Sequence, residues 1–253
     1  MSGMVSRRKM LAGAAVACAA AAVSSSAMSA NKKGGLIMNK EFYTNGALDL
    51  DKVKKAYFDL MDHFNYPVPD IMKTDNFWVC DFQQGDIMAL GMSGIFWINE
   101  KGEYKTTGAG QYTGKYKDDK FGYLLHEIFL LPGQTLPEHT HIGGHEGYPP
   151  KMESWQVRYG EVYFFGQFKH TDEVLISEWP EAKRPWGYGE DWFKSTYITK
   201  RDAKTNQMYT MADPETWHGQ VAGPEGAIVT EVATYHNHVT FSKPGLEFKC
   251  TGH

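Results

Sequence analysis

The residue types best suited to chemistry gather between positions 132 and 153. His139 and His141 are two positions apart, and side chains with that spacing in a strand point to the same face. Glu153 follows after a connecting segment, on what we expect to be the next strand. Two imidazoles on one face with a carboxylate beside them form most of a divalent-metal site. The His-x-His tripeptide alone is equally compatible with a surface loop, so the interpretation depends on its surroundings.

Those surroundings resemble the first motif of the cupin family, which is a Gly, five residues, His-x-His, a spacer, and a Glu with a Gly seven positions later. Gly133 and His139 reproduce the first gap. Two glutamates compete for the acidic position. Glu146 fits the usual short spacer, whereas Glu153 has Gly160 at the required offset. Glu153 is therefore the predicted ligand, and the segment before it (142–150) is an insertion.

The second cupin motif supplies one more histidine from a later strand. His218 fits this motif, because a Pro-containing turn precedes it and the glycine-rich segment 223–226 follows it. His236 and His238 are the alternatives for the fourth ligand, although both fall after the expected strand. His126 lies within an expected strand with no paired ligand nearby, and it is predicted to be a hydrogen-bonded core histidine.

Within the cupins, the chain more closely resembles the D-lyxose isomerase-like group over roughly residues 120–235. The shared motifs are Pro132-Gly133-Gln134, Pro137, Lys151-Met152-Glu153, Trp217-His218 and Gly223-Pro224-Glu225-Gly226-Ala227. The resemblance implies a metal-dependent aldose–ketose isomerase that acts on a sugar. It also implies that the metal ligands are His139, His141, Glu153 and His218. The segment between His141 and Lys151 is longer than the group's usual linker.

Such a reaction moves a proton between C1 and C2 of the open-chain sugar, while a divalent cation polarises the carbonyl. By likeness to the group, Lys151 and Glu231 are the candidates for proton transfer. A desolvated lysine beside a cation would have a lowered pKa and could act as a base. The alternatives are a surface role for Lys151 and a structural salt bridge for Glu231. Trp155 and Trp217, next to ligands, either form walls of the pocket or turn into the core.

Three imidazoles and one carboxylate with open positions suit several divalent ions. We expect one ion per chain, with Mn²⁺ first and Zn²⁺, Fe²⁺, Co²⁺ or Ni²⁺ as alternatives. Another metal-dependent cupin enzyme, such as a dioxygenase or a lyase, would use the same ligands. A non-catalytic binding protein for a sugar or organic acid is the third reading. The ligands alone cannot separate these classes, so the distinction depends on whether Lys151 and Glu231 transfer protons.

The elements that must position these residues are mostly strands. One amphipathic helix is expected at 50–64, followed by strands at 77–82, 87–98, 123–131, 155–168 and 227–235. Many short strands without alternating helices indicate an all-β antiparallel sandwich or barrel, and the cupin resemblance implies a double-stranded β-helix. The segments 103–121 and 179–192 are expected to be loops at the barrel mouth. The chain then divides into an extension with the helix (31–70) and one cupin domain (71–253).

Composition bounds the class of protein. The 253 residues are 42% hydrophobic and carry a net charge of −4, which excludes a wholly disordered chain and a basic nucleic-acid-binding protein. Cys80 and Cys250 could form a disulfide, but Cys80 lies in an apolar run and is better explained as a buried thiol. Aromatic-rich exposed strands favour a homodimer through sheet edges.

Residues 1–30 resemble an export signal rather than part of the fold. Arg7 and Arg8 precede an Ala-rich stretch and a run of small residues, the pattern of a twin-arginine signal for folded proteins. The apolar run is too short for a stable membrane anchor. We therefore expect a cleaved, periplasmic protein whose remaining chain is more acidic, because the segment contains cations and no acidic residue.

Overall fold

Antiparallel strands make up most of the protein, which is seen here as a computed structural model that describes residues 40–98, 123–144, 149–167, 172–234, 236 and 238–250. The strands are β1 (Tyr43–Thr44), β2 (Ala47–Leu48), β3 (Trp78–Cys80), β4 (Met92–Ile98), β5 (Tyr123–Leu130), β6 (Thr135–Thr140), β7 (Glu153–Gly166), β8 (Val174–Leu175), β9 (Tyr197–Asp202), β10 (Met208–Thr210), β11 (His218–Thr234) and β12 (Thr240–Phe241). Among the described residues there is one α-helix, α1 (Leu50–His63), with short 3₁₀ turns at Lys40–Phe42, Asp70–Lys73, Ile176–Glu178 and Glu181–Lys183. The all-β class with an N-terminal helix is confirmed. None of the described helices is long and apolar enough to cross a membrane.

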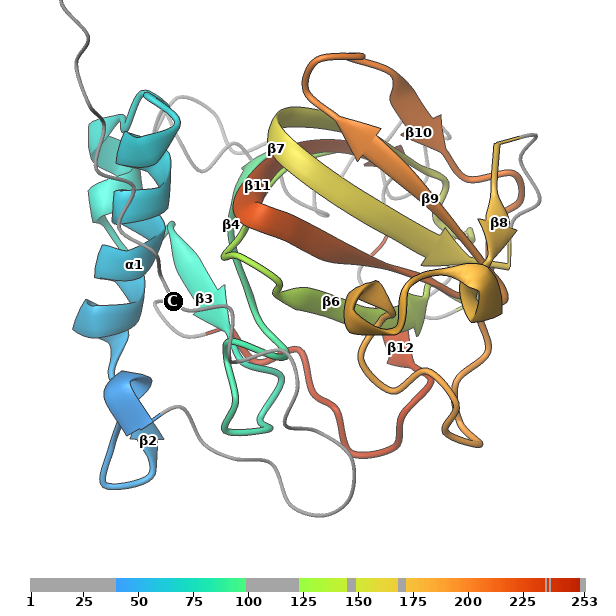
Figure 1. Cartoon of the computed structure of the whole chain (residues 1–253). Helices are drawn as coiled ribbons and strands as arrows, with labels where there is room; N and C mark the ends of the chain where they lie inside the picture. Colours follow the sequence, from blue (N-terminus) through green and yellow to red (C-terminus); the bar gives the residue numbers. More distant parts are fainter. Residues whose placement is uncertain are drawn as a thin grey trace, which may run out of the picture. The chain divides into compact units, whose positions relative to one another are not determined.

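Helix α1 begins where the sequence predicts. The Asp49 side chain accepts a hydrogen bond from the backbone N–H of Lys52 and caps the first turn. Its buried face, which includes Val53, Tyr57 and Leu60, packs on an apolar cluster with residues from β3, β4 and β5. In Figure 1 the helix lies beside the strands with β3 next to it. The helix therefore covers the outer side of the sheet and leaves the interior to the strands.

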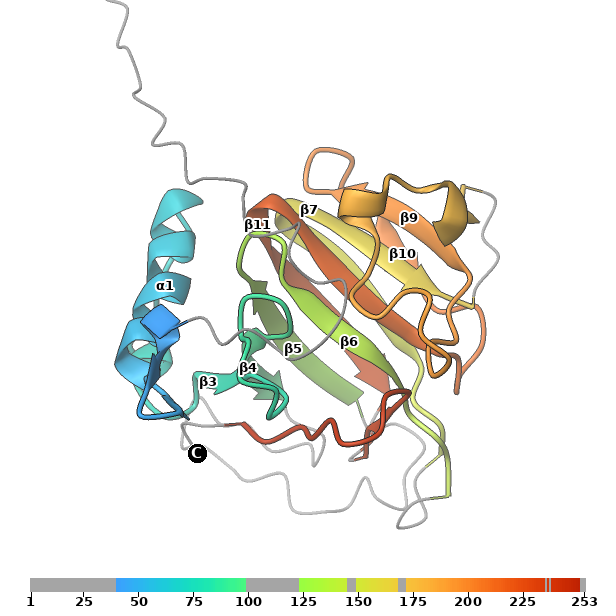
Figure 2. The ribbon, with the colours of Figure 1, turned by 60° about the horizontal axis from the view of Figure 1, so that its bottom comes forward.

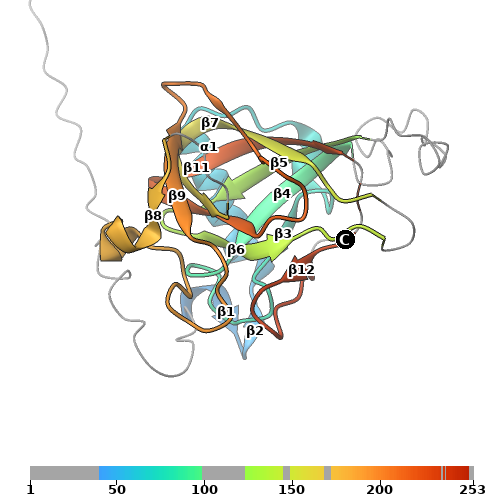
Figure 3. The ribbon, with the colours of Figure 1, turned by 90° about the vertical axis from the view of Figure 1, so that its right-hand side faces the viewer.

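Strands β7 and β11 form the central pair of the sheet. Its order is β3-β4-β5-β11-β7-β9-β8, with β10 on β7 and with β6 paired to both β11 and β12. The first part of β11 pairs with β6, and its second part pairs with β5. Figure 2 shows β5, β6, β7 and β11 side by side, and Figure 3 shows β12 beside β6. One strand thus joins the two parts of the fold that hold the candidate site residues.

Gly160 marks the irregular point in the β7–β11 pair. It pairs with Ala227 and has a φ of +73°, and a Cβ at this position would lie 2.1 Å from the carbonyl oxygen of Gly226. Only glycine fits such a backbone approach. The Gly that the cupin pattern requires after its Glu therefore has a physical reason in this chain.

The strand boundaries differ from expectation where turns lie inside apolar runs. Strand β4 begins at Met92 rather than at 87, because Asp86 accepts a hydrogen bond from Ala89 N–H and forms a turn. Strand β11 begins at His218 rather than at 227, because pairing to β7 continues on both sides of the segment 223–226. The export segment 1–30 and the expected loop 103–121 lie outside the described residues.

Candidate metal centre and active site

Three histidines from two strands meet in the interior. His139 lies in β6 and His141 directly follows it, while His218 is the first residue of β11 and pairs with His139. One ring nitrogen from each of the three lies within 4.8 Å of the others, and all three residues are buried. The structure thus brings together the three histidines that the sequence singled out.

Each of these imidazoles is oriented by a backbone carbonyl. The Nδ1 atoms of His139, His141 and His218 lie 2.8, 2.7 and 2.9 Å from the carbonyl oxygens of Pro137, His238 and Thr216. A carbonyl only accepts hydrogen bonds, so each Nδ1 carries the proton and each neutral ring has its lone pair on Nε2. This is the arrangement that metal-binding histidines adopt.

The charges of the cluster also fit a cation. Burial lowers the pKa of His139 to about 3 and holds the pKa of His141 well below its usual value, so both rings are neutral near pH 7. Oε2 of Glu153 lies 3.1 Å from Nε2 of His218 and 3.5 Å from Nε2 of His141. Three buried imidazoles beside a buried carboxylate form a donor set that binds divalent ions. The residues present therefore fit a metal.

Strand β6 is held at both ends by buried polar side chains. The Gln134 amide accepts hydrogen bonds from Leu131 N–H at 2.6 Å and from the Tyr57 hydroxyl at 3.0 Å, which ties the start of the strand to α1. The Glu138 carboxylate is buried and accepts from the backbone N–H groups of Lys194 and Ser195 at 2.8 and 2.5 Å. Because Glu138 faces away from the cavity, its anchoring fixes the opposite face, where His139 points inward.

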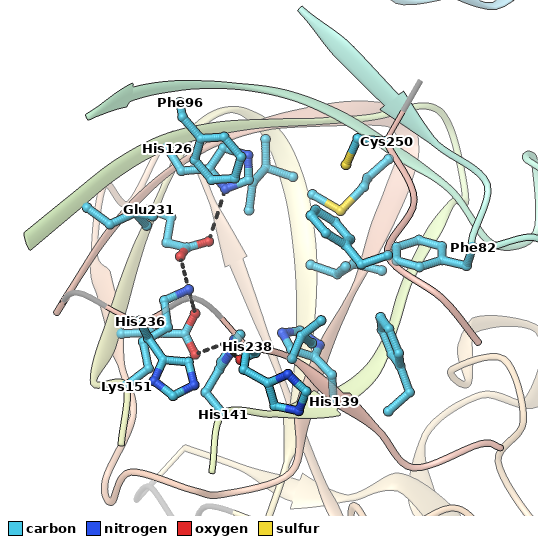
Figure 4. Close-up of a pocket in the computed structure, with 18 residues that line it drawn as sticks. Phe82, Phe96, His126, His139, His141, Lys151, Glu231, His236, His238 and Cys250 are labelled. Atoms are coloured by element: carbon cyan, nitrogen blue, oxygen red, sulfur yellow. Dashed lines mark hydrogen bonds and ion pairs between the residues drawn. The ribbon is translucent and has the colours of Figure 1, made fainter. Parts of the chain in front are cut away.

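A chain of charged groups leads away from the histidines. Lys151 Nζ lies 2.7 Å from Oε1 of Glu153 and 2.7 Å from Oε1 of Glu231. The other oxygen of Glu231 lies 3.4 Å from Nδ1 of His126, which is its partner in the β5–β11 register. All four side chains are buried and line one cavity, and Figure 4 shows Lys151, Glu231 and His126 following one another along its wall. The two candidates for proton transfer are therefore in direct contact.

In the metal-free chain, two carboxylates rather than a cation stand beside the buried Lys151 ammonium. Burial acts to lower the pKa of Lys151, but the carboxylates of Glu153 and Glu231 outweigh burial and raise it above its usual value. The same ammonium overcomes the opposing effect of burial on Glu231 and lowers the pKa of that carboxyl to about 2. In this metal-free arrangement Lys151 is charged and donates hydrogen bonds, and Glu231 is ionised at neutral pH.

The cavity has a volume of about 320 Å³ and two chemically different sides. One side carries His126, His139, His141, Lys151, Glu153 and Glu231, with His236 and His238 at its edge. The remaining described residues of the lining are apolar or cysteine. The volume lies at the low end of the ~300–1,000 Å³ typical of small-molecule sites. A single small molecule fits such a site better than a polymer does.

Several other expectations are settled by placement. Trp155 is 2% exposed, belongs to the core and packs its ring against Tyr209. Of its two predicted positions, pocket wall or core, it therefore takes the core position and does not line the cavity. Strand alternation had left this outcome open. Trp217 and residues 179–192 are also absent from the described lining of this cavity.

The alternative ligands have other roles or lie outside the described residues. His238 supplies the carbonyl that holds His141, and His236 lies beside the His141 ring at a centroid distance of 5.4 Å. Neither joins the cluster of three ligand atoms. Glu146 is among the residues that the structure does not describe. His126 is buried and hydrogen-bonded, as predicted, and it also lines the cavity.

Cys80 and Cys250 do not form a disulfide. The Cys80 thiol is buried, which agrees with a small apolar role. Cys250 reaches the cavity from the C-terminal segment.

Known proteins share this sequence and this fold. A D-lyxose/D-mannose isomerase of Thermosediminibacter oceani is 30% identical over 161 residues, which cover 64% of this chain and 72% of the relative. The chain belongs to the D-lyxose isomerase family. A D-lyxose ketol-isomerase of Cohnella laeviribosi is 28% identical over 62% of this chain and 69% of its own. No family model matches the chain, so this membership rests on the individual relatives.

Solved structures agree on the fold. The L-ribose isomerase of Acinetobacter sp. DL28, solved with L-ribose, superposes with a TM-score of 0.54 at 18% identity and covers 83% of this chain and 94% of its own. The L-ribose isomerase of Cellulomonas parahominis gives 0.53 at 19% identity, with 85% and 96% covered. The expected cupin-type fold is therefore confirmed. Family membership agrees with the expected sugar isomerase, and the three-histidine cluster is consistent with a metal site.

Proposed function

We propose that this protein interconverts an aldose and its ketose, with substrates related to D-lyxose and D-mannose. The observation that carries the proposal is the buried Lys151–Glu231 ion pair, which lines one cavity together with His139 and His141 of the three-histidine cluster. An acid and a base close to a cation site are the groups that moving a proton between C1 and C2 requires. The relatives are named as enzymes for this reaction, and the proposed substrates are taken from their names.

In this proposal Glu231 is the base. Its lowered pKa keeps the carboxylate ionised at neutral pH, so it can take the proton from the carbon beside the carbonyl and return it to the neighbouring carbon. Lys151 donates a hydrogen bond to the sugar oxygen on which negative charge develops, and its ammonium group relays the hydroxyl proton from O2 to O1, so that carbonyl and hydroxyl exchange places. His126 holds the second carboxylate oxygen of Glu231 and fixes the orientation of the base.

His139, His141, Glu153 and His218 would hold the divalent ion. When bound, the ion supplies a Lewis acid that polarises the carbonyl group. We propose Mn²⁺ as that ion, because imidazole and carboxylate donors with open positions suit it. The backbone carbonyls behind the imidazoles keep the Nε2 lone pairs available, so the chain provides the site before the ion arrives.

The test is proton exchange followed by NMR. The purified protein, loaded with Mn²⁺, is incubated in D₂O with D-lyxose, D-mannose, L-ribose and D-xylulose. We expect formation of the ketose or aldose together with deuterium at C2 of the aldose for at least one member of the panel. Absence of both for every sugar, with the ion bound, would contradict the proposal. A non-catalytic sugar-binding protein would bind a panel member without exchange.

We further propose that the protein is exported folded to the periplasm and acts as a homodimer. The Arg7-Arg8 signal supports the export route. Exposed apolar side chains on the edge strands β8 and β10, namely Val174, Leu175 and Met208, support pairing of two copies. Export by this route would allow the ion to be loaded before secretion. Fractionation of cells and sedimentation of the purified protein test these two points.

A further inference from the structure

The apolar side of the cavity has no role in the reaction described above. Phe82, Met92 and Ile128 line it and are at most 2% exposed, and Leu136, Phe241 and Phe248 extend it. Apart from His238, which lies just before β12, the lining residues with charged or imidazole side chains lie in or next to β5, β6, β7 and β11. Figure 4 shows Phe82 and Cys250 across the cavity from Glu231 and Lys151. The substrate's reacting end and its remote end therefore meet different surroundings.

This division matters because a sugar carries a hydroxyl on nearly every carbon. C1 and C2 must lie beside Glu231, Lys151 and the imidazoles, which places the last carbon toward the apolar side. A hydroxyl buried there would lose its hydrogen bonds to water, and the described side chains on that side offer only the weak thiol of Cys250 in exchange. A methyl group in the same place would lose nothing and would bury apolar surface.

We propose that the preferred substrate is an aldose whose terminal carbon is a methyl group, such as a 6-deoxyhexose. The proposal rests on the isomerase function proposed above and specifies its substrate class. The aromatic rings of Phe82 and Phe241 meet edge to face at a centroid distance of 5.5 Å and form the surface that the methyl group contacts. Hydroxyls nearer to C1 keep partners among the histidines and charged groups.

The comparison of D-mannose with 6-deoxy-D-mannose tests the proposal on the unmodified, metal-loaded protein. The two sugars differ only at C6, and both close the same pyranose ring, so their open-chain fractions are similar. We expect kcat/KM for the 6-deoxy sugar to be about 10- to 100-fold higher, the range over which an apolar pocket discriminates against an added hydroxyl. A ratio below tenfold would overturn the proposal.

The outcomes separate this inference from the proposed function. Turnover of D-lyxose or D-mannose without preference for the 6-deoxy sugar leaves the isomerase intact and overturns the methyl site. Turnover of D-lyxose with neither hexose accepted also overturns it, because the apolar side would then have no room for C6. Absence of turnover for every sugar contradicts the isomerase itself, and the methyl site with it.

Substitutions at the apolar side localise the preference. Met92→Gln keeps the side-chain length and adds an amide that can hydrogen-bond to a C6 hydroxyl, so it should lower the 6-deoxy preference at least fivefold. Met92→Leu is the matched control and should keep the preference. Phe241→Tyr adds a hydroxyl with little change of shape and should also lower it, which preserves the test if the buried glutamine prevents folding. Unchanged preference in every folded polar variant would contradict the placement of C6.

Discussion

Lys151 Nζ and Glu231 Oε1 are 2.7 Å apart in the interior, so the two groups proposed to move protons also neutralise each other's charge. Lys151→Met should leave Glu231 as a buried carboxylate without its cation. We expect the free energy of unfolding to fall by about 3–5 kcal/mol, the usual effect of breaking a buried pair. Denaturant unfolding measures it. The double variant Lys151→Met/Glu231→Gln should recover part of the loss, and additive single effects would contradict the coupling.

Glu231→Gln should retain the fold and the ion but lose turnover. The amide cannot accept a proton, and a positioned base typically contributes about 10²–10⁴-fold. Steady-state kinetics on a panel sugar, with metal content measured on the same sample, checks the result. Full turnover with the ion retained would remove Glu231 from the reaction. Loss of the ion would make it a support for the ligands instead.

His126 should act on turnover only through Glu231. His126→Phe keeps a ring against Phe96, which stacks at a centroid distance of 4.4 Å, but removes the donor to Oε2. We expect kcat to fall about tenfold or more with little change in KM, since hydrogen bonds to charged groups contribute about 1.5–3 kcal/mol. The hydrogen bond helps to lower the pKa of Glu231, so its loss should move the acidic limb of the kcat profile to higher pH. A change in KM alone would contradict this role.

Metal content should depend on the three histidines and on Glu153. His141→Ala and Glu153→Ala should each release the ion, and the melting temperature should no longer rise when Mn²⁺ is added. An ion at 100 times its Kd stabilises the folded state by about 2.7 kcal/mol, and that contribution would disappear. Glu146→Ala and His236→Ala are the controls and should keep the ion. If Glu146→Ala releases the ion and Glu153→Ala does not, Glu146 is the acidic ligand and the segment 142–150 is not an insertion.

Acid should destabilise the metal-free protein over a wide range of pH. The folded-state pKa values of His139 and His141 lie below their usual value of 6.5, so the unfolded chain binds protons that the folded chain does not as the pH falls below 6.5. Stability is thus complete above pH 6.5 and declines toward pH 3. The lowered pKa values of Glu153 and Glu231 act in the same direction below about pH 4.5.

Each histidine should contribute up to about 1.4 kcal/mol per pH unit in that range. Urea unfolding at pH 7, 6 and 5, in the presence of a chelator, measures the slope. His139→Asn should show a shallower slope, because one of the groups that fails to protonate in the folded state is gone. A stability that is independent of pH between 7 and 5 would contradict the burial of neutral imidazoles.

Local patterns in the sequence predicted the helix and the metal cluster. The helix was predicted from Asp49 and from the helical spacing of Val53 and Tyr57. The metal cluster was predicted from the spacing of His139 and His141, from the turn before His218 and from the resemblance to cupins. These signals lie within short stretches of chain or in a known motif. They do not require knowledge of which strands pair.

Contacts between distant strands could not be predicted in the same way. The bond between His126 and Glu231 depends on the β5–β11 register, and no local pattern specifies that register. The raised pKa of Lys151 depends on two carboxylates that converge from β7 and β11. The apolar side of the cavity joins Phe82 to Phe241, which are distant in sequence. Such surroundings become visible only when the strands are assembled.

The segment 223–226 brings two side chains of β11 to the same face, although their numbering would place them on opposite faces. His218 and Glu231 are separated by an odd number of positions in β11, and an unbroken strand would turn one of them outward. The register shift between Ala222 and Ala227 resets the alternation, so that both side chains point inward. A change of one residue in the length of this segment would shift the alternation again and turn either His218 or Glu231 away from the interior. Relatives that preserve activity should therefore keep the length of this segment, which contains the shared motif Gly223-Pro224-Glu225-Gly226-Ala227.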